Sequence, residues 1–189
     1  GAFFYLRFMT IKELHALFLE HPHICTDTRK ITKNCLFFAL KGPNFNGNKF
    51  AQEALDKGAA YAIIDEEEFK TSERLVLCDG VLETLQKLAT YHRKYSSAKI
   101  ISLTGSNGKT TTKELIHAVI SKKYRTIATQ GNLNNHIGVP LTLLSIKEDT
   151  EIAIVEMGAN HQKEIEFLCS IAQPDFGYIT NFGQAHLEG

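Results

Sequence analysis

The sequence predicts an α/β protein made of two consecutive units, a small N-terminal one and a second one built on a parallel sheet. Short apolar runs of strand length alternate with stretches of helical periodicity, which is typical of strands joined by helical crossovers. Residues 100–112 read as a strand, a glycine loop and the start of a helix. The chain of 189 residues is 43% hydrophobic, so it has enough apolar side chains to build these cores.

The first unit is predicted to span residues 9–96. Thr10 and Glu13 have the spacing of a capping box and predict a helix whose apolar stripe follows. Further helices are expected over 50–57, ended by Gly58, and over 81–95. Strands are expected over 35–40, 59–64 and 75–78, with polar turns at 25–30 and 44–49. Met9 fits a natural start of the chain, which leaves residues 1–8 as an extension of unknown origin.

The second unit is predicted to span residues 97–189. Its strands are expected over 100–103, 126–129, 152–155 and 176–180. The helix after the glycine loop is expected to carry one apolar face formed by Leu115, Ile116, Val119 and Ile120. Shorter helices are expected within 137–144 and around 165–171. Because helices separate these strands, the sheet should be parallel.

Charge and cysteine use exclude several classes of protein. Lys and Arg number 21, as do Asp and Glu, so the formal net charge is zero. This balance favours neither nucleic acid nor an anionic membrane as partner, and no apolar run approaches the ~20 residues of a membrane span. The four cysteines lie far apart without metal-ligand or redox spacing, which favours a reducing, cytoplasmic setting.

The glycine loop has the residues that a phosphate site needs. Gly105 and Gly108 enclose Ser106 and Asn107, and Lys109 and Thr110 open the helix. Backbone N–H groups from Ser106 to Thr111 can surround an anion, the helix N-terminus adds positive potential, Lys109 can reach the β and γ phosphates, and the Thr110 hydroxyl can hold Mg²⁺. The alternative is an ordinary glycine turn with a surface lysine.

Other polar residues follow the predicted strands, where ligands of open parallel sheets bind. Glu156 ends an apolar strand downstream of the loop, where a Mg²⁺ ligand is expected, although it could simply cap a helix. His186 follows the last strand, and a loop histidine is often a surface residue. Asn134 and Asn135 could bind nucleotide or substrate, or merely favour a turn.

In the first unit, Thr28 and Arg29 stand beside a glycine/asparagine loop. Arginine with a hydroxyl neighbour suits a phosphate group. A surface ion pair explains Arg29 about as well, so both interpretations stay open.

Taken together, these motifs resemble the Mur ligase family of peptidoglycan synthesis. The resemblance is carried in order by TGSNGKTTTKE (104–114), GNLNNHIGVPLTLL (131–144), VEMGANHQKEI (155–165) and ITNFGQAHLEG (179–189). In the first unit, DTRKI (27–31), LFFALKG (36–42) and NGNKF (46–50) resemble the family's uridine-nucleotide-binding domain, with Asn46 and Asn48 where that pattern has Asp and His. The EMGAN form is most similar to the branch that adds D-alanyl-D-alanine.

The resemblance implies an ATP-dependent ligase. It also implies that the first unit is a uridine-nucleotide domain and that the second unit is the first part of an ATPase domain. The ligase would join D-alanyl-D-alanine to UDP-N-acetylmuramoyl-tripeptide through an acyl phosphate, with Mg²⁺, as a monomer. The roles implied are given by group. Gly105, Ser106, Asn107, Gly108, Lys109, Thr110, Thr111 and Asn135 would bind ATP; Thr110, Glu156 and His186 would hold metal; Lys109 and His186 would be catalytic; Thr28, Arg29, Asn46, Gly47 and Asn48 would bind the uridine nucleotide.

Family members continue beyond the last motif into a third, amino-acid-binding domain, so we expect the 189 residues alone to be inactive. A sister ligase is the nearest alternative, either the diamino-acid-adding enzyme or folylpolyglutamate synthetase. A nucleotide-dependent switch is a second alternative, but it gives no reason for the first unit. A uridine-nucleotide-binding module without activity is a third.

Overall fold

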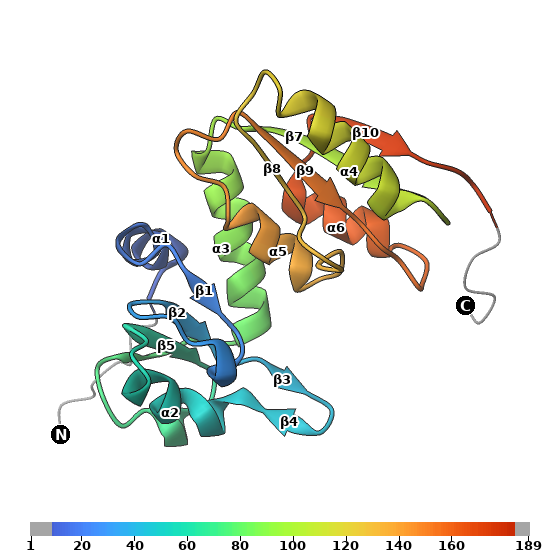
Figure 1. The fold of residues 1–189 in the computed structure, drawn as a ribbon. Coiled ribbons are helices and arrows are strands. Elements are labelled where there is room, and N and C mark those ends of the chain that lie inside the picture. The colour runs from blue at the N-terminus through green and yellow to red at the C-terminus, as the bar shows by residue number, and fades with distance from the viewer. Residues whose placement is uncertain (1–8, 184–189) are drawn as a thin grey trace. The chain divides into compact units, whose positions relative to one another are not determined.

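The computed structural model describes residues 9–183 and divides between Leu88 and Ala89 into two compact units. Each unit has its own four-stranded parallel sheet (Figure 1). The division falls inside a helix, whereas the boundary predicted from the sequence lies just after that helix. The predicted α/β class is confirmed, as is the parallel sheet predicted for the second unit.

The elements of the first unit alternate between short strands and helices or single helical turns. They are α1 (Ile11–Glu20), β1 (Ile24–Cys25), η1 (Thr28–Lys30), β2 (Leu36–Phe38), β3 (Lys41–Gly42), β4 (Phe45–Asn46), η2 (Gly47–Phe50), α2 (Ala51–Asp56), β5 (Tyr61–Ile64), η3 (Glu67–Phe69), β6 (Leu75–Leu77) and the first turns of α3 (Val81–Tyr95). The capping box predicted at Thr10 and Glu13 is present.

The sheet of the first unit has the strand order β1-β2-β5-β6. Its core is a cluster of fully buried side chains that includes Phe37, Ala54, Ile64 and Leu75, and α2 packs against β5. The strands predicted over 35–40, 59–64 and 75–78 contain β2, β5 and β6. Sequence reasoning missed β1 and the antiparallel pair of β3 with β4, because strands of two residues are too short to show a period.

The second unit begins with the last turns of α3 and continues with longer strands. Its elements are β7 (Lys99–Thr104), α4 (Lys109–Ile120), β8 (Thr126–Ala128), α5 (Gly138–Leu143), β9 (Ile152–Glu156), α6 (Glu164–Ala172) and β10 (Phe176–Ile179). Each strand and helix predicted for this unit is found, with bounds that differ by a few residues. Among the described residues, no helix combines the length and apolar character needed to cross a bilayer.

The strand order of the second sheet is β10-β7-β9-β8. The chain leaves β7 through α4 toward β8, and leaves β9 through α6 in the opposite direction toward β10. Right-handed crossovers in opposite directions place α4 on one face and α6 on the other (Figure 1). The direction therefore switches between the neighbouring strands β7 and β9, and this is where ligands bind in such sheets.

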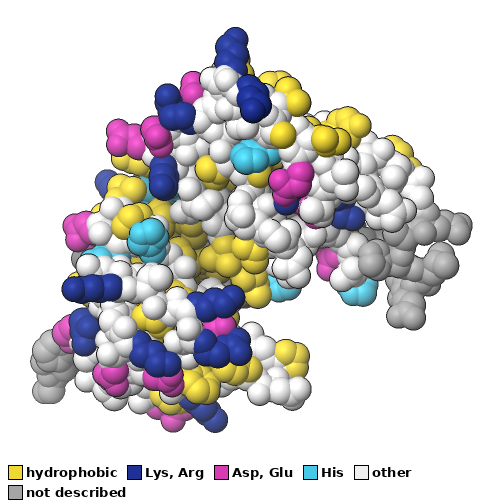
Figure 2. Space-filling view, viewed as in Figure 1, with side chains coloured by type: hydrophobic (Ala, Val, Ile, Leu, Met, Phe, Trp, Pro, Cys, Tyr) yellow, Lys and Arg dark blue, Asp and Glu magenta, His cyan; other side chains and the backbone are white. Residues whose placement is uncertain are grey.

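One prediction about α4 is wrong in part. Ile116 packs against the buried cluster of Leu103 and Ile154, as expected. Leu115 and Val119 point away from the core, with 64% and 72% of their surface exposed. Because neighbouring helix positions are about 100° apart, the inward face passes through Lys113 and Ile116 instead. Figure 2 shows apolar side chains on the surface over α4.

Asp175 joins the starts of β10 and β7. Its carboxylate accepts hydrogen bonds from the backbone N–H of Ile100 at 2.8 Å, from Lys99 Nζ at 2.9 Å and from Arg93 Nη2 at 2.8 Å. The backbone hydrogen bond from Ile100, followed by the ion pair with Lys99, holds the pKa of Asp175 below its usual range. Ionised Asp175 therefore stabilises the folded state.

We expect Asp175→Asn to lower the free energy of unfolding at pH 7 by about 1 kcal/mol. Because the pKa of Asp175 is lower in the folded state, its contribution is complete above about pH 4, the pKa of an unperturbed aspartate, and is lost as the pH falls further. Urea denaturation at pH 7 and at pH 3 measures both effects. Asp149→Asn is the control, since its side chain is 68% exposed and its nitrogen partner on Arg125 lies 3.8 Å away. Equal losses for both variants would contradict the expectation.

Candidate functional site

The candidate site lies where β7 and β9 end. These strands pair in parallel with Leu103 opposite Glu156, so the loop after β7 begins beside the last residue of β9. The loop runs from Gly105 to Gly108, and α4 begins at Lys109. The sheet topology therefore brings together two segments that are about 50 residues apart in the sequence.

Two glycines give the loop its shape. Gly105 has φ +140° and Gly108 has φ +75°, in a region that side chains other than glycine rarely adopt. A Cβ atom at Gly105 would also overlap the Thr180 hydroxyl, whereas at Gly108 it would meet open space. Gly108 is the N-cap of α4 and offers no side-chain cap. The Thr112 N–H donates to the Gly108 carbonyl at 2.9 Å. The amides that precede it in the first turn have no carbonyl partner within the helix, so they are available to an anion at the loop.

The segment after β10 holds the loop from the other side. Ser106 Oγ donates to the Gly183 carbonyl at 2.7 Å and accepts from the Gly183 N–H at 2.9 Å. The Thr180 hydroxyl donates to the Asn107 carbonyl at 2.6 Å, and the Asn107 N–H donates to Asn181 Oδ1 at 3.1 Å. The amides of Ser106 and Asn107 are thus bonded to Asn181. The amides of residues 108–111 are better placed to meet an anion.

Lys109, Thr110 and Glu156 come together at this point. Lys109 Nζ donates to the Gly105 carbonyl at 2.7 Å, which keeps the ammonium at the loop. The Thr110 hydroxyl donates to Glu156 Oε1 at 3.3 Å, and Asn134 Nδ2 donates to the same oxygen at 3.0 Å. Glu156 is only 2% exposed, and its second oxygen, Oε2, is buried without a hydrogen bond.

These oxygens fit a magnesium ion. Mg²⁺ prefers hard oxygen ligands and usually takes one or two from the protein, with phosphate and water completing its shell. The Thr110 hydroxyl and the Glu156 carboxylate supply such a pair. Within residues 9–183 no group of three or more His, Cys, Asp and Glu side chains could hold a metal by itself. His186, the third predicted metal ligand, lies outside the described residues.

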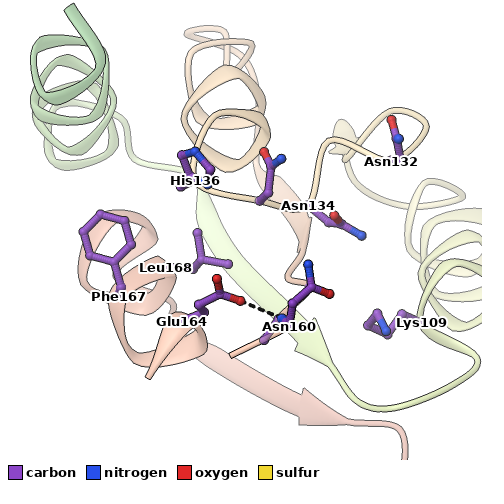
Figure 3. A pocket seen from close by; sticks show the side chains of 11 residues that line it. Lys109, Asn132, Asn134, His136, Asn160, Glu164, Phe167 and Leu168 are labelled. Carbon is purple, nitrogen blue, oxygen red and sulfur yellow. Dashed lines mark hydrogen bonds between the residues drawn. The ribbon is translucent and has the colours of Figure 1, made fainter. Parts of the chain in front are cut away.

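A cavity of about 470 Å³ adjoins the loop. Figure 3 shows Lys109 on one side of it and Glu164, Phe167 and Leu168 of α6 on the other, with His136 between α6 and the asparagines of the loop before α5. Glu164 Oε2 accepts from the Asn160 N–H at 2.6 Å and the His161 N–H at 3.1 Å. The bond from Asn160 is the main cause that lowers the pKa of Glu164. The cavity thus has polar walls and one apolar patch.

The two neighbouring asparagines have different environments. Asn135 Oδ1 accepts from the N–H groups of Ile137 and Gly138 at 3.1 and 2.9 Å and so caps the start of α5. Asn134 is the one that contacts Glu156, and a Cβ atom at Gly158 would lie 3.1 Å from its side chain. The ATP role predicted for Asn135 stays a prediction, and Asn134 is the better-placed residue.

In the first unit, the predicted substrate residues make mostly internal contacts. Arg29 Nη2 pairs with Asp27 Oδ2 at 2.7 Å, although the Arg29 side chain is 84% exposed, and this guanidinium holds the pKa of Asp27 well below its usual range. Thr28 begins the single turn η1 that Asp27 caps. The surface ion pair that the sequence left open for Arg29 is therefore present, and a role toward a nucleotide stays a prediction.

The loop of Asn46 to Asn48 is tied to the end of β5. Asn48 is 1% exposed; its Nδ2 donates to Asp65 Oδ1 at 2.8 Å and its Oδ1 accepts from the Asp65 N–H at 3.0 Å. Asn46 Nδ2 donates to Glu66 Oε2 at 2.9 Å. A Cβ atom at Gly47 would overlap the backbone of residues 39 and 40. These three residues build the turn. Their contacts with a uridine nucleotide stay a prediction, because the contacts within the turn do not test them.

Sequence reasoning missed two residues behind Glu156. Lys113 is 1% exposed and donates from Nζ to the Thr129 carbonyl at 2.7 Å. The Thr129 hydroxyl in turn accepts from the Glu156 N–H at 2.9 Å. Lys113 follows Thr110 by three residues, and this spacing could have indicated that both side chains lie on the same face of the helix. Nothing in the sequence shows that this lysine is buried.

The fold and this site define an α/β protein of the phosphate-loop class, with a glycine loop, a lysine and a threonine between a strand and a helix. Residues 22–101 match the model described as "Mur ligase family, catalytic domain", and residues 103–189 match the "Mur ligase middle domain". The chain belongs to the Mur ligase family.

Curated relatives and solved structures agree. The UDP-N-acetylmuramoyl-tripeptide–D-alanyl-D-alanine ligase of Bacillus subtilis is 44% identical over 87% of this chain and 36% of its own length. The Escherichia coli enzyme of that name is 41% identical over 94% of this chain and 39% of its own. A crystal structure of MurF from Acinetobacter baumannii has a TM-score of 0.80 at 37% identity, over 87% of this chain and 36% of that one.

A structure of MurF ligase from Thermotoga maritima in complex with ADP has a TM-score of 0.74 at 34% identity and covers 83% of this chain and 36% of that one. The chain thus spans little more than a third of the length of the relatives that it matches.

We expect Gly105→Ala to be more harmful than Gly108→Ala. Both positions have positive φ, and each alanine should cost about 1 kcal/mol of stability for that reason. Only at Gly105 does the added methyl group also collide with Thr180, so that loss should reach about 2–3 kcal/mol. Urea denaturation and calorimetric ADP binding measure the two effects, with Gly177→Ala as the unstrained control. Equal losses at residues 105 and 108 would show that the Thr180 contact does not shape the loop.

Proposed function

We propose that the full-length protein is the ATP-dependent ligase that joins D-alanyl-D-alanine to UDP-N-acetylmuramoyl-tripeptide in the synthesis of the peptidoglycan precursor. One observation carries the proposal: Lys109, Thr110 and Glu156 meet at the switch point of the second sheet, beside a cavity large enough for part of a substrate. The names of the relatives supply the substrates, and the ADP complex of one related structure supports the nucleotide.

The reaction has to bring a carboxylate to a polyphosphate. The terminal carboxylate of the tripeptide attacks the γ-phosphorus of ATP, and the bond from that phosphorus to the β-γ bridging oxygen breaks to release ADP. The amine of D-alanyl-D-alanine then attacks the acyl carbon of the resulting acyl phosphate, expels phosphate and loses a proton. Positioning and neutralisation of charge give most of the help that a protein can give to such a phosphoryl transfer.

Each group at the site would have a separate role in this reaction. The ammonium of Lys109 would reach the β and γ phosphates, and the amides of residues 108–111 would surround them. Thr110 and Glu156 would hold Mg²⁺, which neutralises phosphate charge when it is bound. The cavity between Lys109 and α6 would receive the attacking carboxylate and the incoming amine, because it opens directly beside the phosphate loop (Figure 3).

The first unit would bind the uridine nucleotide. Its exposed Arg29 and the turn at Asn46 support this role, and Phe45 and Phe50 stack beside that turn with ring centroids 5.2 Å apart. All four cysteines are free, which supports a reducing, cytoplasmic setting. We expect the enzyme to act as a monomer.

In the full-length protein, Lys109→Ala should abolish ligation and leave binding of the uridine substrate intact. The lysine is the group that would offset phosphate charge, and it belongs to the second unit, whereas the residues proposed for uridine belong to the first. Phosphate release dependent on both substrates measures ligation, and calorimetry measures substrate binding. Lys122→Ala, at an exposed lysine after α4, is the control. A fall of less than about tenfold, roughly 1.4 kcal/mol, would contradict the phosphate role.

The same assay separates the sister ligases. A screen of amine acceptors should show phosphate release with D-alanyl-D-alanine and not with diamino acids or glutamate. Turnover with a single diamino acid would identify the diamino-acid-adding enzyme, and turnover with glutamate on a folate substrate would identify folylpolyglutamate synthetase. Hydrolysis of ATP without any acceptor would favour a nucleotide-dependent switch instead.

A further inference from the structure

Lys113 is a charged side chain in an unusual place. It is 1% exposed, and lysine is almost never fully buried unless it is paired. Its Nζ donates to the Thr129 carbonyl at 2.7 Å and lies 3.0 Å from Glu114 Oε1. Glu114 is 62% exposed, so solvent weakens its hold on the lysine. The other anionic group near the ammonium is buried Glu156, whose Oε2 lies 3.9 Å from Nζ.

The buried carboxylate of Glu156 lacks a hydrogen-bond partner for one of its two oxygens. Its Oε1 accepts from Thr110 and Asn134, whereas Oε2 is buried without a hydrogen bond. A buried carboxylate oxygen with no partner is costly unless a positive charge is close. Lys113 is the ammonium that faces this oxygen. The two oxygens of Glu156 therefore have different surroundings: one is turned toward the phosphate loop and the other toward a fixed cation.

The lysine is fixed by the same residue that fixes the backbone of Glu156. The Thr129 carbonyl accepts from Lys113, and the Thr129 hydroxyl accepts from the Glu156 N–H at 2.9 Å. Thr110 and Lys113 are three residues apart on α4, so they project from one face of the helix toward β9. The end of β8 thus sets the position of the ammonium against the carboxylate.

The charges of this cluster have a consequence for metal binding. The buried pair of Lys113 and Glu156 has no net charge, and Lys109 adds a further positive charge at the loop. A bare divalent cation would meet a carboxylate whose charge is already compensated and one further like charge, that of Lys109. Nucleotide phosphates would supply the missing negative charge, so metal and nucleotide should bind together rather than one after the other.

We propose that Lys113 is a positioning residue, the internal counter-ion of Glu156, which turns one carboxylate oxygen toward the phosphate loop and makes uptake of a divalent cation depend on the nucleotide. The proposal rests on the metal role proposed above for Glu156. It predicts that loss of the ammonium weakens the fold without metal and strengthens the binding of metal without nucleotide. A lysine with a merely structural role would produce the first effect and not the second.

The test measures binding of Mn²⁺, as a spectroscopic probe for Mg²⁺, to the nucleotide-free, full-length protein by electron paramagnetic resonance. Lys113→Met should bind Mn²⁺ about tenfold more tightly than the unaltered protein, because a close positive charge has been removed. Lys113→Arg, which keeps the charge, should resemble the unaltered protein. Lys122→Met is the matched control at an exposed lysine. Adding Glu156→Gln to Lys113→Met should remove the gain, because the carboxylate is the ligand.

Thermal melts in a chelator keep the proposal testable if Lys113→Met folds poorly. Lys113→Met and Glu156→Gln should each lower the melting temperature, and the double variant should be more stable than Lys113→Met alone, because no buried charge is left unpaired. A double variant no more stable than Lys113→Met would overturn the counter-ion role. So would Mn²⁺ binding by Lys113→Met equal to that of Lys122→Met.

The two levels of the proposal fail differently. If Glu156→Gln binds Mn²⁺ in the presence of ADP as tightly as the unaltered protein does, the metal role of Glu156 is wrong and the inference falls with it. If Glu156→Gln abolishes that binding but Lys113→Met behaves like Lys122→Met, the metal site stands and only the role of Lys113 is wrong.

Discussion

The hydrogen bond between the Thr110 hydroxyl and Glu156 Oε1 joins the first turn of α4 to the end of β9, and the candidate site depends on it. It exists because β7 and β9 pair with Leu103 opposite Glu156, which brings the glycine loop beside the carboxylate. Burial of that carboxylate, at 2% exposure, then requires polar partners around it. Asn134 donates to one carboxylate oxygen and Lys113 faces the other, while the Thr129 hydroxyl accepts from the Glu156 N–H. One charged residue thus joins segments that follow β7 and β8 to the end of β9.

The sequence predicted the parts of this arrangement that depend on local signals. The strand before Gly105, the break of the chain at the two glycines and the helix from Lys109 follow from residue types and their spacing, and the structure confirms them. Glu156 was predictable as the end of an apolar strand downstream of the loop. Its proximity to Thr110 followed from a general rule of parallel sheets rather than from any residue nearby in the sequence.

The features that sequence reasoning missed depend on tertiary partners. A lysine in a helix is normally assigned to the surface, so the burial of Lys113 becomes visible only once the Thr129 carbonyl lies in front of it. Leu115 was assigned to the core because it is apolar, yet the sheet contacts the adjacent position, Ile116. In each case the deciding neighbour is distant in the sequence.

The pair of hydrogen bonds between Ser106 and Gly183 has a consequence for the way this protein can change over evolutionary time. The side chain of one residue serves both as donor to, and as acceptor from, the backbone of the other, so a replacement at position 106 that lacks a hydroxyl removes both bonds at once. Position 183 takes part through its main chain alone and can vary in identity as long as its backbone keeps its path. Tolerance to substitution is therefore unequal at the two ends of a single contact.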